Sequence, residues 1–310
     1  MIEPLFIPTD QYLVQSLPTV WFGVVMFTLA MYVLLDGFDF GIGILYATRS
    51  DEHDRETLLS AFGPVWDANE VWLVAFGTTT LAAFPLVYSE LLSDHYLLAI
   101  AIVLSLLFRG LGPELREQRE DEEWHRLCDR MFVGGSAVTP MLLGMLVGSW
   151  VFASGTFSLP SLLTGLALVA LSVTAGGAFV AAKTDGSLRA DMSRYASIGT
   201  VAYLVGAVVL LATVFALDAA GAREKLLSPV PLALVVMTVI FALASIALAR
   251  RHRYRARFFA VAVVAVLLAG LVASLLYPTV YPPTGHTVSD VVVSPLALNL
   301  VTVLGLPVLL

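Results

Sequence analysis

Apolar residues form nine long windows along this chain of 310 residues, separated by breaks that are polar, charged or rich in Pro and Gly. An α-helix needs roughly 20 apolar residues to cross the hydrocarbon core of a bilayer. The pattern therefore predicts a single domain, residues 1–310, built from about nine transmembrane helices. The expected spans are 20–48, 69–91, 95–113, 132–155, 161–183, 196–217, 230–249, 258–277 and 291–310.

The composition supports an all-α integral membrane protein, multi-pass in the cell membrane. Hydrophobic residues make up 58% of the chain and charged residues only 13%, which is too little polar surface for a water-soluble globule. The single cysteine, Cys128, excludes a disulfide framework, a zinc-binding cysteine pair and an iron–sulfur ligand set. Nothing in the sequence indicates nucleic-acid binding, and the expected surroundings are membrane lipid.

The basic residues predict an orientation. Most of the 17 Lys and Arg residues fall in the first, third, fifth and seventh loops, whereas the even-numbered loops hold only Arg223 and Lys225. Because basic residues are held on the cytoplasmic side of short loops, we expect the N-terminus outside and the C-terminus in the cytoplasm. No basic residue precedes the first apolar stretch, so we expect a retained helix rather than a cleaved signal peptide. Arg109 is left inside the membrane.

Polar residues in expected spans are concentrated in the first 120 residues. A charge near the bilayer centre costs on the order of 3 kcal/mol, so such charges usually face the protein interior and pair with one another. In D-G-F-D-F-G-I-G (36–43), the spacing of three puts Asp36 and Asp39 on one helix face, and the glycines allow close backbone approach. We expect Arg109 to be the counter-ion of some of Asp36, Asp39 and Asp67. The alternative is a helix-packing notch with hydrated acids.

The stretch G-P-V-W-D-A-N-E-V-W (63–72) opens the second span with two carboxylates, Asp67 and Glu70. One interpretation is a variant capping box at the helix start. Against it, Pro64 is a preferred first-turn residue and would leave Asp67 inside the first turn. A helix N-terminus favours the ionised carboxylate and burial favours the neutral one, and a proton relay needs these two effects to compete.

The remaining motifs indicate little chemistry. K-T-D-G-S-L (183–188) is typical of a cytoplasmic turn. The five histidines all fall in loops or at helix ends, so no pair suits axial haem ligation or a metal centre. The sequence has no G-x-S-x-G elbow and no Walker-type phosphate loop. We therefore expect no redox cofactor and no metal bound by this chain itself, which leaves proton or ion handling.

Five motifs, in order and spacing, resemble subunit II of the cytochrome bd-type quinol oxidases. They are L-D-G-F-D-F-G-I-G (35–43), G-P-V-W-D-A-N-E-V-W-L-V (63–74), A-A-F-P-L-V-Y (82–88), L-F-R-G (107–110) and K-T-D-G-S-L (183–188). The match covers roughly residues 20–200, and Y-P-T-V-Y-P-P (277–283) looks like the outer loop of that family. The expected helix count also agrees.

The resemblance implies a heterodimer that reduces O2 to water with electrons from quinol. Subunit I of that family carries haem b and haem d, and subunit II holds no haem; whether a structural quinone lies in subunit II is left open. The resemblance also implies a cytoplasmic proton path through the acid of the W-D-x-N motif, here Asp67, and a second acid after the F-R pair, here Glu114. This chain has Ala68 where the family more often has Gly, and Glu114 where Asp is common.

The resulting hypothesis is that Asp67 relays cytoplasmic protons and that Glu114 lies on the same route, with Glu70 the better candidate for the helix cap. The residues expected to orient or support this site are Trp66, Asn69, Glu70, Asp36, Asp39 and Arg109. A proton- or ion-coupled secondary transporter is the alternative, because a clustered Asp/Arg site within the membrane suits it too. A purely structural partner of subunit I is a third.

Overall fold

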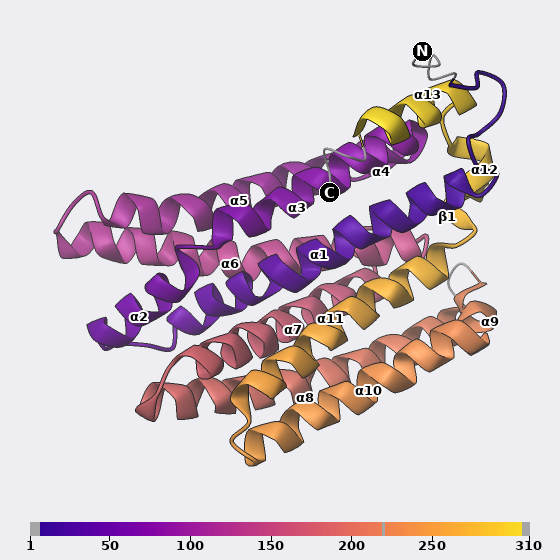
Figure 1. The fold of residues 1–310 in the computed structure, drawn as a ribbon. Coiled ribbons are helices and arrows are strands. Elements are labelled where there is room, and N and C mark those ends of the chain that lie inside the picture. Colours follow the sequence, from indigo (N-terminus) through magenta and orange to yellow (C-terminus); the bar gives the residue numbers. More distant parts are fainter. Residues whose placement is uncertain (1–6, 219–220, 306–310) are drawn as a thin grey trace, which may run out of the picture.

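The structure is a computed structural model that describes residues 7–218 and 221–305, and its elements are almost all helices (Figure 1). The helices are α1 (Leu17–Tyr46), α2 (Glu52–Phe62), α3 (Trp66–Ala83), α4 (Pro85–Asp94), α5 (Tyr96–Arg116), α6 (Glu122–Val151), α7 (Leu159–Lys183), α8 (Gly186–Leu217), α9 (Ala222–Leu227), α10 (Pro229–Arg250), α11 (Tyr254–Leu276), α12 (Val288–Val291) and α13 (Pro295–Leu300). A π-helical turn, Val301–Gly305, continues α13, and the short strands β1 (Thr279–Tyr281) and β2 (His286–Thr287) pair antiparallel.

Seven of these helices are long and apolar enough to cross a membrane, namely α1, α5, α6, α7, α8, α10 and α11. They correspond to the predicted first span and the predicted third to eighth spans. The prediction of a helical membrane protein is therefore confirmed, and the count of nine spans is not.

The predicted second span, 69–91, is two helices rather than one. Phe84 ends α3 with φ of −135° and ψ of 61°, and Pro85 begins α4. Proline has no backbone N–H and disfavours helical geometry in the residue before it, so the helix breaks at this dipeptide. The predicted ninth span, 291–310, begins at the last residue of α12 and contains α13 and the π-helical turn, and residues 306–310 lie outside the described part of the chain.

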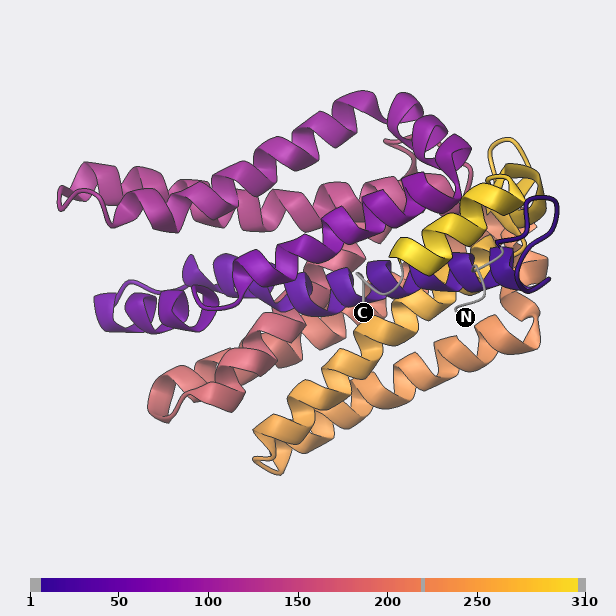
Figure 2. The ribbon, with the colours of Figure 1, turned by 45° about the horizontal axis from the view of Figure 1, so that its top comes forward.

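Helix α1 runs through the middle of the bundle and packs against α3, α6, α7 and α11. Figure 2 shows α3, α4 and α5 on one side of α1, and α8 and α10 on the other. One end of the bundle, at the left of Figure 1, holds α2 and the connections from α5 to α6, α7 to α8 and α10 to α11. We call it the basic end, because Arg49, Arg55, Arg119, Arg251 and Arg253 lie there.

Two glycines of the predicted 36–43 motif allow α1 to approach its neighbours closely. A Cβ atom on Gly41 would lie 1.9 Å from the Ser172 carbonyl oxygen of α7, and one on Gly43 would lie 1.9 Å from Ser136 Oγ of α6. Gly176 of α7 is equally confined, because its Cβ would lie 2.4 Å from the Gly41 carbonyl carbon. The backbones of α1 and α7 touch here. The sequence predicted a close approach at these glycines but did not name the partner helix.

We expect Gly41→Ala to force α1 and α7 apart and to destabilise the protein by about 1 to 3 kcal/mol or more, since overpacked cores respond in this range. Gly37→Ala is the matched control in the same motif: nothing lies within 4 Å of its Cβ position, and alanine is the better helix former. The thermal unfolding midpoints of the two purified variants test this. Equal midpoints would show that the close approach is not required.

Candidate functional site

A buried ion pair joins α1 to α5. The side chains of Arg109 and Asp36 are both 0% exposed, and Arg109 Nη1 and Nη2 donate to Asp36 Oδ2 and Oδ1 at 2.9 and 2.5 Å. Such a bidentate pair is strong and geometrically specific. The expected counter-ion pairing is therefore present, and Asp36 is the acid that takes both hydrogen bonds.

Asp39, one turn along α1, completes a buried charged cluster that we define as Asp36, Asp39, Arg109 and Asn69. Asn69 Nδ2 of α3 donates to Asp39 Oδ2 at 2.8 Å, and Arg109 Nη2 lies 3.9 Å from the same oxygen. Asp39 Oδ1 and Arg109 Nε have no hydrogen-bond partner among the described protein atoms. Because unsatisfied buried polar groups are costly, these two atoms are positions where water would bind.

An aromatic wall separates this cluster from the basic end. The guanidinium carbon of Arg109 lies 4.5 Å from the centroid of the Phe40 ring and 5.5 Å from that of Phe62. Trp66 stacks on Phe62, with centroids 5.7 Å apart and planes 9° apart. Trp66 also covers Gly110, whose Cβ position is 3.1 Å from the indole. The W-D-x-N motif therefore contributes Trp66 to the wall and Asn69 to the cluster.

A cleft of about 800 Å³ opens on the other side of this wall, between α2, α3 and α5. Three carboxylates line this acidic cleft, Glu56, Glu114 and Glu117. Arg116 lines it too, but it pairs with Glu52 and Asp129. Phe62 and Trp66 line it too, so Phe62 separates the cleft from Arg109. Asp67 is not among the lining residues: its exposed side chain lies elsewhere on the first turn of α3. Glu114 therefore lies in a cleft that only Phe62 separates from Arg109, and Asp67 does not line that cleft.

The cap expected at Asp67 and Glu70 is wrong. Helix α3 begins at Trp66 rather than Pro64, its N-cap residue is Val65, and no side chain makes a cap hydrogen bond there. Asp67 lies within the first turn, and Glu70 is already past it, too far along the helix to cap the first N–H groups. Glu70 is half-buried in the electrostatic field of Arg109, Asp36 and Asp67.

Exposed residues follow one stripe on α3 and one on α5, and each stripe ends in an acid at the basic end. On α3 the stripe is Asp67, Val71, Val74, Thr78 and Leu81; on α5 it is Leu97, Ile100, Leu104, Leu107, Leu111 and Glu114. The exposed stripe of α8, Arg194, Ile198, Val201, Val205 and Val208, ends instead in a base. The ends of these three stripes at the basic end therefore differ in charge: acids on α3 and α5, and a base on α8.

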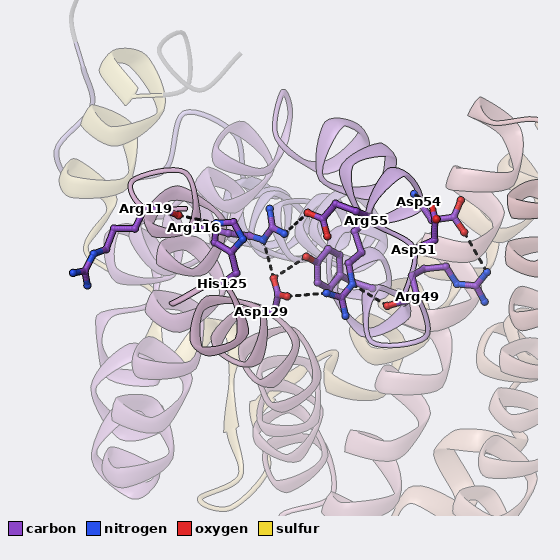
Figure 3. Close-up of polar contacts among 10 residues, drawn as sticks. Arg49, Asp51, Asp54, Arg55, Arg116, Arg119, His125 and Asp129 are labelled. Carbon is purple, nitrogen blue, oxygen red and sulfur yellow. Dashed lines mark hydrogen bonds and ion pairs between the residues drawn. The ribbon is translucent and has the colours of Figure 1, made fainter. Parts of the chain in front are cut away.

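A second polar cluster at the basic end was not predicted from the sequence (Figure 3). Asp129 of α6 accepts hydrogen bonds from Tyr46 Oη at 2.7 Å, Arg55 Nη1 at 3.1 Å and Arg116 Nε at 3.1 Å. Arg116 also pairs with Glu52. These residues come from two helix pairs, α1 with α2 and α5 with α6, and Asp129 lies 83 and 74 positions from Tyr46 and Arg55, so no local spacing could have revealed those contacts. The cluster ties α1, α2, α5 and α6 together.

Arg257 is a second fully buried arginine, in the first turn of α11 at the basic end, and the sequence did not predict its burial. The sequence assigns Arg257 to a loop, but α11 begins at Tyr254 and buries this side chain completely. Arg257 Nη1 donates to the Ser193 carbonyl at 2.7 Å and to Ser193 Oγ at 2.8 Å, and Nη2 donates to Ser197 Oγ at 3.0 Å. Ser193 and Ser197 lie 64 and 60 positions before Arg257 in the chain, so no local pattern in the sequence indicates these contacts.

The histidines lie apart from one another. His95 is buried, with its ring nitrogens at 3.1 Å from the Leu91 carbonyl and 2.8 Å from Ser149 Oγ. His125 lies at the basic end, 2.7 Å from the Arg119 carbonyl, and His286 lies 3.6 Å from Glu90. Over residues 7–218 and 221–305, no three His, Cys, Asp or Glu side chains are placed to hold a metal ion.

Comparison with known proteins assigns the family. The sequence model described as cytochrome bd terminal oxidase subunit II matches residues 17–310. The chain belongs to this family. Together with the seven apolar helices, membership makes it a multi-pass protein of the bacterial plasma membrane. The resemblance stated from the motifs is confirmed.

Three relatives are described as second subunits of cytochrome oxidases, and their identity to this chain is moderate. The chain is 29% identical to cytochrome bd ubiquinol oxidase subunit 2 of Bacillus subtilis, over 90% of this chain and 86% of that protein. It is 28% identical to cytochrome bd-I ubiquinol oxidase subunit 2 of Escherichia coli, over 62% of this chain and 55% of that protein. It is 26% identical to a probable cytochrome oxidase subunit 2 of Haemophilus influenzae, over 63% and 56%.

We expect Asp36→Asn to destabilise this family member by about 3 to 5 kcal/mol, because it leaves the buried Arg109 charge without its bidentate partner. Asp39→Asn removes the charge that faces Arg109 Nη2 at 3.9 Å and leaves an amide oxygen that can accept from Asn69. It should cost about 1 kcal/mol. Asp185→Asn, which breaks an exposed pair with Arg189, is the control and should cost less than about 1 kcal/mol. Thermal unfolding midpoints rank the three variants. A larger effect at Asp39 than at Asp36 would contradict this assignment.

Proposed function

We propose that this chain is the haem-free second subunit of a membrane quinol oxidase that reduces O2 to water. In this proposal a partner, subunit I, carries haem b and haem d and oxidises the quinol. This chain supports that partner and supplies protons from the cytoplasm. Quinol and O2 are used by the complex, and the chemistry takes place in the partner.

The main support for the proposed proton path is that the buried charged cluster lies directly behind the acidic cleft. Phe62 lines the cleft and also lies over Arg109, so one aromatic ring separates water in the cleft from Asp36, Asp39 and Arg109. The unpaired atoms Asp39 Oδ1 and Arg109 Nε favour bound water inside that ring. In the proposed path, Glu114 collects protons at the cleft.

Asp67 is proposed to act later on the proton path than Glu114, at the surface where this chain meets subunit I. An exposed carboxylate at the end of an apolar stripe is unfavourable against anionic lipid headgroups, which attract Lys and Arg instead. The stripes of α3 and α5 end in Asp67 and Glu114, and that of α8 ends in Arg194. We therefore assign the α3 and α5 face to subunit I and the α8 face to lipid, and Asp67 passes protons toward the partner.

The orientation follows from the same charges. The basic end is proposed to face the cytoplasm, because it carries most of the arginines and short basic loops are retained there. The cleft with Glu114 then opens to the cytoplasm. Both proposed proton acids are on the side from which the oxidase would take up protons.

Replacement of the relay acid tests the proton path in the assembled complex. We expect Asp67→Asn and Glu114→Gln each to lower quinol-driven oxygen consumption by roughly a hundredfold, the lower range for loss of a proton-transfer group, with normal haem absorbance. Glu122→Gln, another exposed acid at the basic end that does not line the cleft, should retain full turnover. Full turnover of Asp67→Asn with normal haem content would contradict the relay.

A photo-reactive amino acid tests the partner face. Placed at Leu107 of α5, it should form a covalent adduct with the haem-bearing partner, because that position is exposed on the proposed interface. Placed at Val205 of α8, equally apolar and exposed, it should give no protein adduct. Denaturing electrophoresis with detection of both subunits reads the result. The reverse pattern would assign the partner to α8 and would leave Asp67 without its proposed acceptor.

A further inference from the structure

A pocket of about 390 Å³ lies at the basic end and shares no lining residue with the acidic cleft. It is bounded by the end of α1, by α2 and by the first turns of α6, and three arginines line it: Arg55, Arg126 and Arg130. Arg126 and Arg130 are one helical turn apart and exposed, so both guanidinium groups reach the same space. Neither the proton path nor the buried cluster uses these two residues.

The charge of this pocket is positive after its acid is accounted for. Asp129 is the carboxylate that lines it, and Arg55 and Arg116 already neutralise that group. Among the described residues, Arg126 and Arg130 pair with no carboxylate and make no side-chain hydrogen bond. The pocket therefore presents free guanidinium donors, the groups that bind phosphate oxygens best.

Beyond the pocket, the face of α6 that carries the two arginines becomes apolar with distance from the basic end. Arg126, Arg130, Gly134 and Val138 follow at intervals of four and share one face of the helix. Gly134 lines the pocket, and nothing lies within 4 Å of its Cβ position. Val138 is 46% exposed. A ligand of this surface has an anionic head at the membrane boundary and an apolar tail below it.

We propose that this pocket binds the phosphodiester of an anionic phospholipid. Arg126 and Arg130 contact the phosphate oxygens, Arg55 contributes its remaining N–H groups, and the glycerol backbone lies over Gly134 with an acyl chain along Val138. Inorganic phosphate shares the head-group chemistry but does not use the apolar face. The proposal does not depend on the proposed proton path, because it concerns a different opening of the basic end.

Lipid retention by the assembled complex tests the proposal. The complex is placed in nanodiscs that contain equal amounts of phosphatidylglycerol and phosphatidylcholine, briefly delipidated, and the retained lipids are counted by native mass spectrometry. We expect the double variant Arg126→Gln/Arg130→Gln to retain at most roughly one tenth of the phosphatidylglycerol that the unmodified complex retains. Each basic residue near the membrane contributes about 1 kcal/mol to binding anionic lipid, and about 1.4 kcal/mol is a factor of ten in affinity.

The matched control is Arg250→Gln/Arg251→Gln, which removes the same charge from exposed positions at the end of α10 that do not line the pocket. It should retain phosphatidylglycerol at the level of the unmodified complex. Equal losses in both double variants would show a general charge effect and would overturn the site. Unchanged retention in Arg126→Gln/Arg130→Gln would overturn it as well.

A second variant separates lipid from free phosphate. Gly134→Leu fills the open space below the arginines and leaves their charges in place. It should reduce phosphatidylglycerol retention severalfold, and millimolar inorganic phosphate should not displace the lipid from the unmodified complex. Displacement by inorganic phosphate, together with full lipid retention in Gly134→Leu, would assign the pocket to free phosphate and contradict the proposal.

Discussion

The bidentate pair between Arg109 and Asp36 is the interaction on which this structure depends most. Both side chains are fully buried within membrane-spanning helices, where an unpaired charge is expensive. The pair therefore fixes α5 against α1, and with them the position of Asp39, Asn69 and the aromatic wall. The glycines of α1 act in the same region by letting α6 and α7 touch its backbone.

The distribution of the other charges follows from membrane electrostatics. Arginines lie at the basic end, where Asp129 holds two of them between helices, and the exposed stripe of α8 ends in Arg194. The stripes of α3 and α5 end in Asp67 and Glu114 instead. A single rule, that anionic headgroups favour bases and disfavour acids, accounts for the proposed lipid faces, the proposed partner face and the proposed phospholipid pocket.

The sequence predicted some features well because their signals are local. Hydropathy found the seven long helices, the spacing of Asp36 and Asp39 placed them on one face, and the F-R-G motif indicated the counter-ion. The break at Phe84 and Pro85 was missed because apolar residues continue across it, although proline is a known helix breaker. The contacts of Asp129 and the burial of Arg257 depend on helices brought together only in the folded bundle, so no spacing in the chain encodes them.

Time-resolved proton uptake tests the central claim most directly, namely that this chain carries protons from the acidic cleft past the buried charges to its partner. The assembled complex is placed in vesicles in one orientation, and a pH indicator on each side follows a single turnover with O2. The account predicts uptake from the side of the basic end, delayed at least tenfold in Asp67→Asn. Uptake from the opposite side, or an unchanged rate in that variant, would contradict it.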